Sequence, residues 1–174
     1  PSGATHSISV TRTATGAGIP PSQNLTVIPS FTVTPTSGTV GTSITVTGKG
    51  FAASETITVT INDESAKTGI ATDTNGSWQT TFAFPDSPGG VHNIGVYGST
   101  TSAGAVTDKT FTVSPGITAT PSTGTAGTQV TVTGTGFGAG ETGIVVTFNA
   151  MSVSSGITAS TKGRWTTTFQ VPAG

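Results

Sequence analysis

The chain has 174 residues, of which 32% are hydrophobic and only 7% are charged, and its formal net charge is -1. This balance provides no basic surface for nucleic acid or an anionic membrane, and no apolar run approaches the roughly 18 residues of a membrane helix. The absence of cysteine excludes disulfides and thiolate metal sites. Roughly a third of the residues are serine or threonine, and threonine fits a pleated, half-buried surface. The composition therefore predicts an all-β protein.

The first 28 residues have a counterpart later in the chain. GATHSISV (3–10) matches GGVHNIGV (89–96), and NLTVIPSFTVTP (24–35) matches TFTVSPGITATP (110–121), in both cases 86 positions on. Self-similarity at a fixed period indicates repeated structural units. Residues 1–28 are therefore predicted to be the last two strands of a unit, donated to or continuing from a neighbour. Their apolar side chains at the predicted contact between subunits are Ile8, Val10, Leu25 and Val27.

Residues 29–114 contain one whole unit. Apolar and polar residues alternate with period two, turn residues separate the runs, and no segment has a convincing helical period. Seven short strands with turns about every 8–12 residues are typical of a β-sandwich. The strands are predicted near 31–35, 43–48, 55–62, 66–72, 77–84, 91–98 and 106–113. The same alternation places threonines on the outward faces of this unit and the next, at Thr45, Thr47, Thr58, Thr60, Thr131 and Thr133.

Residues 115–174 repeat only the front of that unit. ETITVTIN (55–62) returns as ETGIVVTFN (141–149) with one extra residue, which we assign to a β-bulge at Gly143. The last two strands have no counterpart here, and they are the piece with which the chain begins.

A half-unit of this kind would expose core side chains and unpaired strand edges. We expect residues 1–28 of a neighbouring copy to complete it, or the peptide to continue as a window of a longer repeat protein. A start without methionine fits either a processed subunit or such a window. Closure within one chain is disfavoured by the short Val113–Ile117 junction.

Two stretches carry a family resemblance. PTSGTVGTSITVTGKGF and PSTGTAGTQVTVTGTGF resemble the opening of the IPT/TIG family of immunoglobulin-like modules, which share a P-x-x-G-x-x-G-T-x-V-T-V-x-G-x-x-F pattern. TDTNGSW (72–78) resembles the turn and strand of bacterial immunoglobulin-like adhesin repeats. The resemblance implies tandem immunoglobulin-like β-sandwiches, circularly cut so that one is completed by strands from a neighbouring copy. Such modules serve as spacers, stalks, adhesins and enzyme accessories.

The aromatic residues could stack on sugars, but their spacing favours a core. Trp78 and Trp165 alternate with apolar residues on one face of their strands. His6 and His92 are repeat equivalents at inward parity, which favours histidines hydrogen-bonded to backbone at the edge of a core. The predicted core positions are Trp78, Phe82, Phe84, Trp165, Phe169 and Val171.

No residue pattern predicts catalysis, a metal site or a cofactor. Asp63, Glu64, Asp73 and Asn75 could supply oxygens to calcium, but the second copy has Ala150, Met151, Ser160 and Lys162 at these positions. A nucleophilic hydroxyl would need a base and an orienting third group, and neither is visible. Asn24 and Asn75 lie in N-x-S/T patterns and are candidate N-glycosylation sites.

These observations predict a non-enzymatic structural subunit of an extracellular filament, stalk or surface layer. The predicted partner is a second copy of the chain, in a head-to-tail homopolymer at or outside the cell surface. No nucleic acid, cofactor or membrane insertion is expected, and covalent glycans or lateral packing would cover the threonine-rich faces. The alternative is a glycan- or protein-binding module of an adhesin or secreted enzyme.

Overall fold

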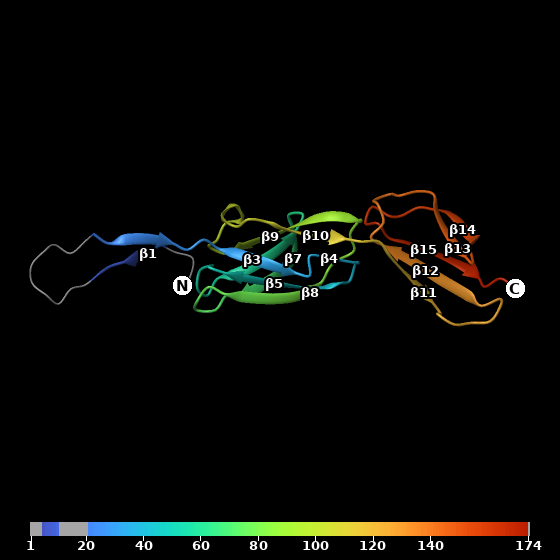
Figure 1. Ribbon diagram of the computed structural model, residues 1–174, viewed down its shortest axis with the longest axis horizontal. Coiled ribbons are helices and arrows are strands. Elements are labelled where there is room, and N and C mark those ends of the chain that lie inside the picture. The colour runs from blue at the N-terminus through green and yellow to red at the C-terminus, as the bar shows by residue number, and fades with distance from the viewer. Residues whose placement is uncertain (1–4, 11–20, 174) are drawn as a thin grey trace, which may run out of the picture. The chain divides into compact units, whose positions relative to one another are not determined.

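The computed structural model describes residues 5–10 and 21–173 (Figure 1). Its regular structure is β throughout this part of the chain, apart from one short 3-10 turn, η1 (Ala103–Ala105). The all-β prediction is therefore confirmed.

The N-terminal segment forms a two-stranded antiparallel sheet of its own. It consists of β1 (Thr5–Ile8) and β2 (Gln23–Thr26), in which His6 lies opposite Leu25. In the part of the chain that the structure describes, neither strand pairs with any other. We call this pair the β1–β2 hairpin.

The middle of the chain contributes two sheets with the order of an immunoglobulin-like sandwich. One sheet has the order β3-β5-β8 and the other has the order β4-β10-β9-β6-β7. The pairs β3–β5, β6–β7 and β6–β9 are antiparallel, whereas β10 runs parallel to β4. The strands are β3 (Ser30–Thr34), β4 (Ser37–Gly38), β5 (Ser43–Lys49), β6 (Thr56–Ile61), β7 (Glu64–Ala71), β8 (Trp78–Ala83), β9 (Gly90–Gly98) and β10 (Lys109–Val113).

Alternation along these strands builds the core of the middle unit. Successive side chains of a strand point to opposite faces, so β5 buries Ile44 and Val46 and leaves Ser43 and Lys49 exposed. Both sheets contribute large side chains that are almost fully buried, namely Ile44, Val46, Phe51, Ile57, Val59, Phe84, Ile94, Val96 and Phe111.

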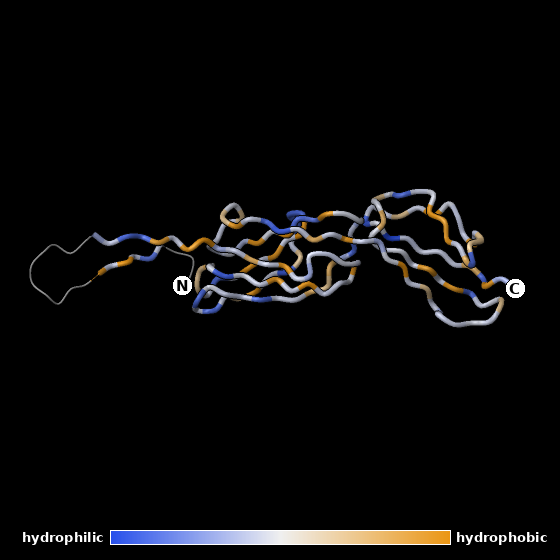
Figure 2. Tube along the Cα trace, in the orientation of Figure 1, coloured by the Kyte–Doolittle hydropathy of each residue, from blue (hydrophilic) through white to orange (hydrophobic). Residues whose placement is uncertain are grey.

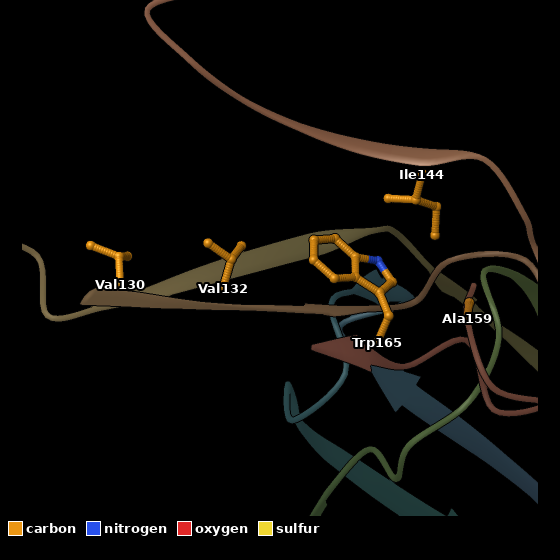
Figure 3. Packing of buried hydrophobic residues seen from close by; sticks show 5 residues of the cluster. All are labelled: Val130, Val132, Ile144, Ala159 and Trp165. Carbon is orange, nitrogen blue, oxygen red and sulfur yellow. The ribbon is translucent and has the colours of Figure 1, made fainter. Parts of the chain in front are cut away.

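The C-terminal strands that the structure describes correspond to β3, β5, β6, β7 and β8 of the middle unit. One sheet has the order β11-β12-β15 and corresponds to β3-β5-β8, while β13 and β14 correspond to β6 and β7. Figure 3 shows Val130, Val132 and Trp165 projecting to the same side of their strands, with Ile144 reaching toward them from another ribbon. The strands are β11 (Gly116–Thr120), β12 (Gln129–Thr135), β13 (Ile144–Phe148), β14 (Met151–Ile157) and β15 (Trp165–Gln170).

Contacts group the chain into two compact units. The first consists of Pro1–Thr34, Thr45–Thr81 and Asn93–Lys109, and it holds the β3–β5 and β6–β7 pairings. The second holds the β4–β10 pairing and all the strands β11 to β15. It consists of Pro35–Ile44, Phe82–His92 and Thr110–Gly174.

The structure corrects three details of the sequence prediction. The two-residue strand β4 was not predicted, and the last strand of the middle unit begins at Lys109 rather than near 106 because η1 precedes it. Thr60 was placed on an outward face but is only 6% exposed. Thr60 lines a pocket together with Gly95 of β9 and Asp108 from the segment that follows β9.

Candidate functional site

The two tryptophans are core residues in the structure. Trp78 and Trp165 are each 5% exposed, and each meets a phenylalanine edge-on, with ring centroids 5.7 Å apart for Phe51–Trp78 and 5.3 Å for Phe137–Trp165. A sugar needs an open aromatic face, so neither indole can serve as a platform for one.

The phenylalanines of the predicted core differ between the two units. Phe84 is 1% exposed, and its ring stacks on Phe111 of β10 at 4.3 Å. Its repeat equivalent Val171 is only half-buried, as are Phe82 and Phe169. Among the described residues, the C-terminal strands include no equivalent of β10 that could cover Val171. The side chain of Val171 therefore stays half-buried.

The residues considered for calcium form turns. One oxygen of Asp73 accepts hydrogen bonds from the backbone N–H groups of Asn75 and Ser77, at 2.8 and 2.9 Å. In the second copy the hydroxyl of Ser160 accepts from the two corresponding N–H groups. The neutral hydroxyl of Ser160 thus accepts the same two backbone hydrogen bonds as the carboxylate of Asp73. The turn therefore explains why each copy has an oxygen-bearing side chain at this position. Among the described residues, no three His, Asp or Glu side chains are grouped so that they could hold a metal ion.

Asp63 belongs to a tight hairpin. Ile61 pairs with Glu64, and Asn62 and Asp63 between them have φ of 48° and 67°. A two-residue loop with positive φ at both positions matches the right-handed twist of the flanking strands, and Asn and Asp tolerate it. The second copy repeats the turn at Asn149 and Ala150.

The histidines and the glycosylation candidates are placed differently. His92 is buried, and its Nε2 lies 2.8 Å from the backbone carbonyl of Pro88, which accepts a hydrogen bond. His6 on β1 is half-buried. Asn24 and Asn75 are both exposed to solvent.

A buried carboxylate, which the sequence reasoning missed, ties the loops of the middle unit together. Glu55 is 2% exposed and accepts hydrogen bonds from the N–H groups of Ala52 at 3.0 Å and Thr100 at 2.7 Å. It also accepts from the N–H and, at 2.9 Å, the hydroxyl of Thr101. Burial raises the pKa of the Glu55 carboxyl, but the hydrogen bonds from Thr101 and Thr100 outweigh burial and hold the pKa below its ordinary value of 4.5. The signal in the sequence was the repeat F-x-x-x-E, which recurs as Phe137 and Glu141.

Replacing Glu55 with glutamine is expected to destabilise the middle unit by about 2–3 kcal/mol at pH 7, because an amide cannot accept from all of these donors. Since the pKa is lowered on folding, the contribution is present above the unfolded-state pKa and is lost as pH falls through the folded-state value. Urea unfolding at pH 7 and pH 3 should therefore show a large difference between wild type and Glu55→Gln at pH 7 and a smaller one at pH 3. Glu141→Gln is the matched control, because Glu141 is exposed and accepts from Gly138 alone. An equal loss at both pH values would contradict this account.

The C-terminal strands line an apolar groove of about 530 Å³. We call it the open groove. None of its lining residues is charged, and they come from β11, β12, β13, β15, the turn after β11 and the position directly after β15. The lining residues are Ile117, Ala119, Pro121, Ser122, Thr123, Gly124, Val130, Val132, Val146, Thr147, Phe148, Phe169 and Val171.

In the middle unit, β9 and β10 occupy the place that corresponds to the open groove. Ile61 of β6 pairs with Ile94 of β9, and Gly38 of β4 pairs with Val113 of β10. Phe31 is therefore only 3% exposed, whereas its repeat equivalent Ile117, in the open groove, is 67% exposed. The open groove lies at the place that corresponds to β9 and β10 of the middle unit.

The β1–β2 hairpin carries the complementary surface. Ile8, Val10 and Leu25 are each 55% exposed, whereas their repeat equivalents Ile94, Val96 and Phe111 are at most 1% exposed in the middle unit. Hydrophobic positions recur along the described part of this hairpin (Figure 2). The chain thus presents an apolar groove and an apolar hairpin that have matching places in its repeat.

The base of the hairpin also repeats a contact of the middle unit. A Cβ built on Gly50 would lie 3.0 Å from the carbonyl oxygen of Ile28 and 3.1 Å from a methyl carbon of Val27. At the equivalent Gly136 the neighbours are the carbonyl oxygen of Ser114 and a methyl carbon of Val113. Both glycines have positive φ, so the close approach of Val27 and Ile28 to Gly50 is repeated by Val113 and Ser114 at Gly136.

Comparison with known proteins identifies the repeats. The sequence model of the IPT/TIG domain family matches residues 27–113 and again residues 117–174. No curated protein sequence matches the chain. Among solved structures, trypsin-activated alpha-2-macroglobulin from Escherichia coli is similar to it at 13% identity and a TM-score of 0.36, over 83% of this chain and 13% of the macroglobulin chain. In the described part of the chain, no helix has the length and apolar character needed to cross a bilayer.

Proposed function

Because the chain belongs to the IPT/TIG family of immunoglobulin-like domains, we propose that it is a structural subunit of an extracellular filament, stalk or surface layer. In this proposal, immunoglobulin-like domains follow one another head to tail, joined by strand complementation or by continuation of the peptide. The subunit carries load or spacing and performs no chemistry.

The observation that supports the proposal is that one chain carries both an open apolar groove and an exposed apolar hairpin. Each exposes apolar side chains whose equivalents are buried in the middle unit. Repeat arrays gain stability from interfaces between neighbouring units, and a contact between two different surfaces of one molecule generates an open chain of subunits. The net charge of -1 leaves little long-range field for salt to screen.

The surface chemistry fits exposure outside the cell. Asn24 and Asn75 are accessible to glycosylation, and outward threonines such as Thr45 and Thr133 hydrogen-bond across strands to Thr81 and Thr166. Such faces have few charges, so glycans or lateral packing would cover them.

Negative-stain microscopy of the purified protein tests this function. The expected result is filaments with an axial repeat on the order of 80 Å per chain, at roughly 3.3 Å per strand residue. Discrete monomers that bind a glycan array would contradict it and favour the binding-module alternative.

A further inference from the structure

We infer that the open groove binds the β1–β2 hairpin of a second copy of this chain, with both strands entering together and each pairing at its outer edge. This inference rests on the proposed function and specifies the contact that would join its subunits. The partner is argued from the repeat, because the middle unit already holds the equivalent hairpin β9–β10 in the equivalent place.

The register of the first strand follows from the middle unit. There, Gly95 lies opposite Thr60 and Ile94 opposite Ile61 in the antiparallel β9–β6 pair. At the repeat positions, Ser9 of the incoming copy lies opposite Thr147, and Ile8 lies opposite Phe148 of β13. β13 pairs with β14 alone among the described strands, and the incoming strand supplies backbone partners at its other edge.

The second strand closes the opposite side of the open groove. In the middle unit Thr112 and Val113 of β10 run parallel to Ser37 and Gly38. The equivalent pairs place Thr26 of the incoming copy beside Thr123, and its Val27 beside Gly124. Leu25 then covers Val171, as Phe111 covers Phe84.

The two surfaces match in chemistry as well as in register. No charged residue lines the open groove, and the described parts of the hairpin segment, residues 5–10 and 21–28, contain no Asp, Glu, Lys or Arg. Docking therefore buries apolar surface without stranding a charge.

The base of the hairpin favours an intermolecular contact. Val27 and Ile28 lie against Gly50 at the start of their own middle unit, as Val113 and Ser114 lie against Gly136. In chain order the hairpin comes before the middle unit, and the strands that line the open groove come after it. The contact joins the N-terminal segment of one copy to the C-terminal strands of another.

Cysteine cross-linking tests the register, because the natural chain has no cysteine. Ser9→Cys chains are mixed with Thr147→Cys chains, both changes being at exposed positions. Directly opposed residues of antiparallel strands are about 4.5–5.5 Å apart at Cα, which suits a disulfide. Oxidation of the mixture should yield about tenfold or more covalent dimer than either variant alone, because docking raises the local thiol concentration.

The matched control mixes Ser9→Cys with Thr166→Cys, which is exposed on β15 and hydrogen-bonds to Thr133 across the β11-β12-β15 sheet. A second pair, Thr26→Cys with Thr123→Cys, tests the other edge and should also cross-link.

Equal cross-linking with the control would overturn the inference, as would an intrachain disulfide in the Ser9→Cys/Thr147→Cys double variant. Filaments without cross-linking at these pairs would leave the proposed function standing and overturn this contact. Cross-linked dimers from a protein that never forms filaments would support the contact and contradict the proposed function.

Discussion

Replacing Phe111 with alanine is expected to destabilise the middle unit by about 3–5 kcal/mol. Leu25→Ala, at the equivalent position of the β1–β2 hairpin, should change the stability of an isolated chain by no more than about 0.5 kcal/mol. Phe111 is fully buried and stacks on Phe84, whereas Leu25 is 55% exposed. The two substitutions thus compare equivalent repeat positions, one buried in the middle unit and one exposed on the hairpin.

Each unit has its own tryptophan, which allows the two to be followed separately. In a Trp165→Phe background, urea unfolding monitored by fluorescence reports on Trp78 and therefore on the middle unit. For a unit of about 60–100 residues, 1 kcal/mol corresponds to about 4–8 °C in Tm, so Phe111→Ala should lower the Tm by about 12 °C or more. A loss under about 1 kcal/mol would mean that β10 does not seal the core.

The same comparison separates folding from assembly. Leu25→Ala should leave the isolated chain intact yet weaken association between copies, because the side chain would contact Val171 only in the docked state. Concentration-dependent light scattering of Leu25→Ala and wild type measures this. Equal association of the two proteins would show that Leu25 lies outside the contact between copies.

Much of the fold could be predicted from local patterns. Period-two alternation placed the strands of the middle unit because their inward residues, such as Ile57 and Val59, face a core while their neighbours face solvent. The internal repeat then extended the same assignment to β11–β15. The hairpin turn at Asn62 and Asp63 also has a local signature, although Asp63 was first considered as a calcium ligand.

Features that depend on distant contacts were not predictable in this way. The two residues of β4 pair with β10, which is far away along the chain, and Thr60 lies in a pocket with residues from β9 and from the segment after it. The role of Glu55 depends on the loop at Thr100 and Thr101, which is 45 residues away along the chain. The open groove itself became visible only when the exposures of equivalent residues could be compared.

Gly48 is a second case in which tertiary contact decides the role of a residue. In the sequence T-V-T-G-K-G-F it looks like a turn glycine, but the structure places it within β5 beneath the indole of Trp78. A Cβ on Gly48 would lie 2.2 Å from the indole nitrogen, and the same arrangement recurs between Gly134 and Trp165. Among the described residues neither buried indole nitrogen has a hydrogen-bond partner, and each ring packs against a phenylalanine.

Gly48→Ala is therefore expected to destabilise the middle unit by about 3 kcal/mol or more, since a methyl group cannot fit without displacing a buried ring. Trp78→Phe removes the ring atoms nearest the new methyl group, so the double variant should be less destabilised than the sum of the two single variants. Thermal unfolding followed by circular dichroism measures all three, with Gly104→Ala as the control, because a Cβ on Gly104 would meet nothing within 4 Å. Gly134→Ala and Trp165→Phe should show the same coupling in the C-terminal strands. Additive losses would mean that the glycine is required for the backbone of β5 and not for the space that it leaves to the indole.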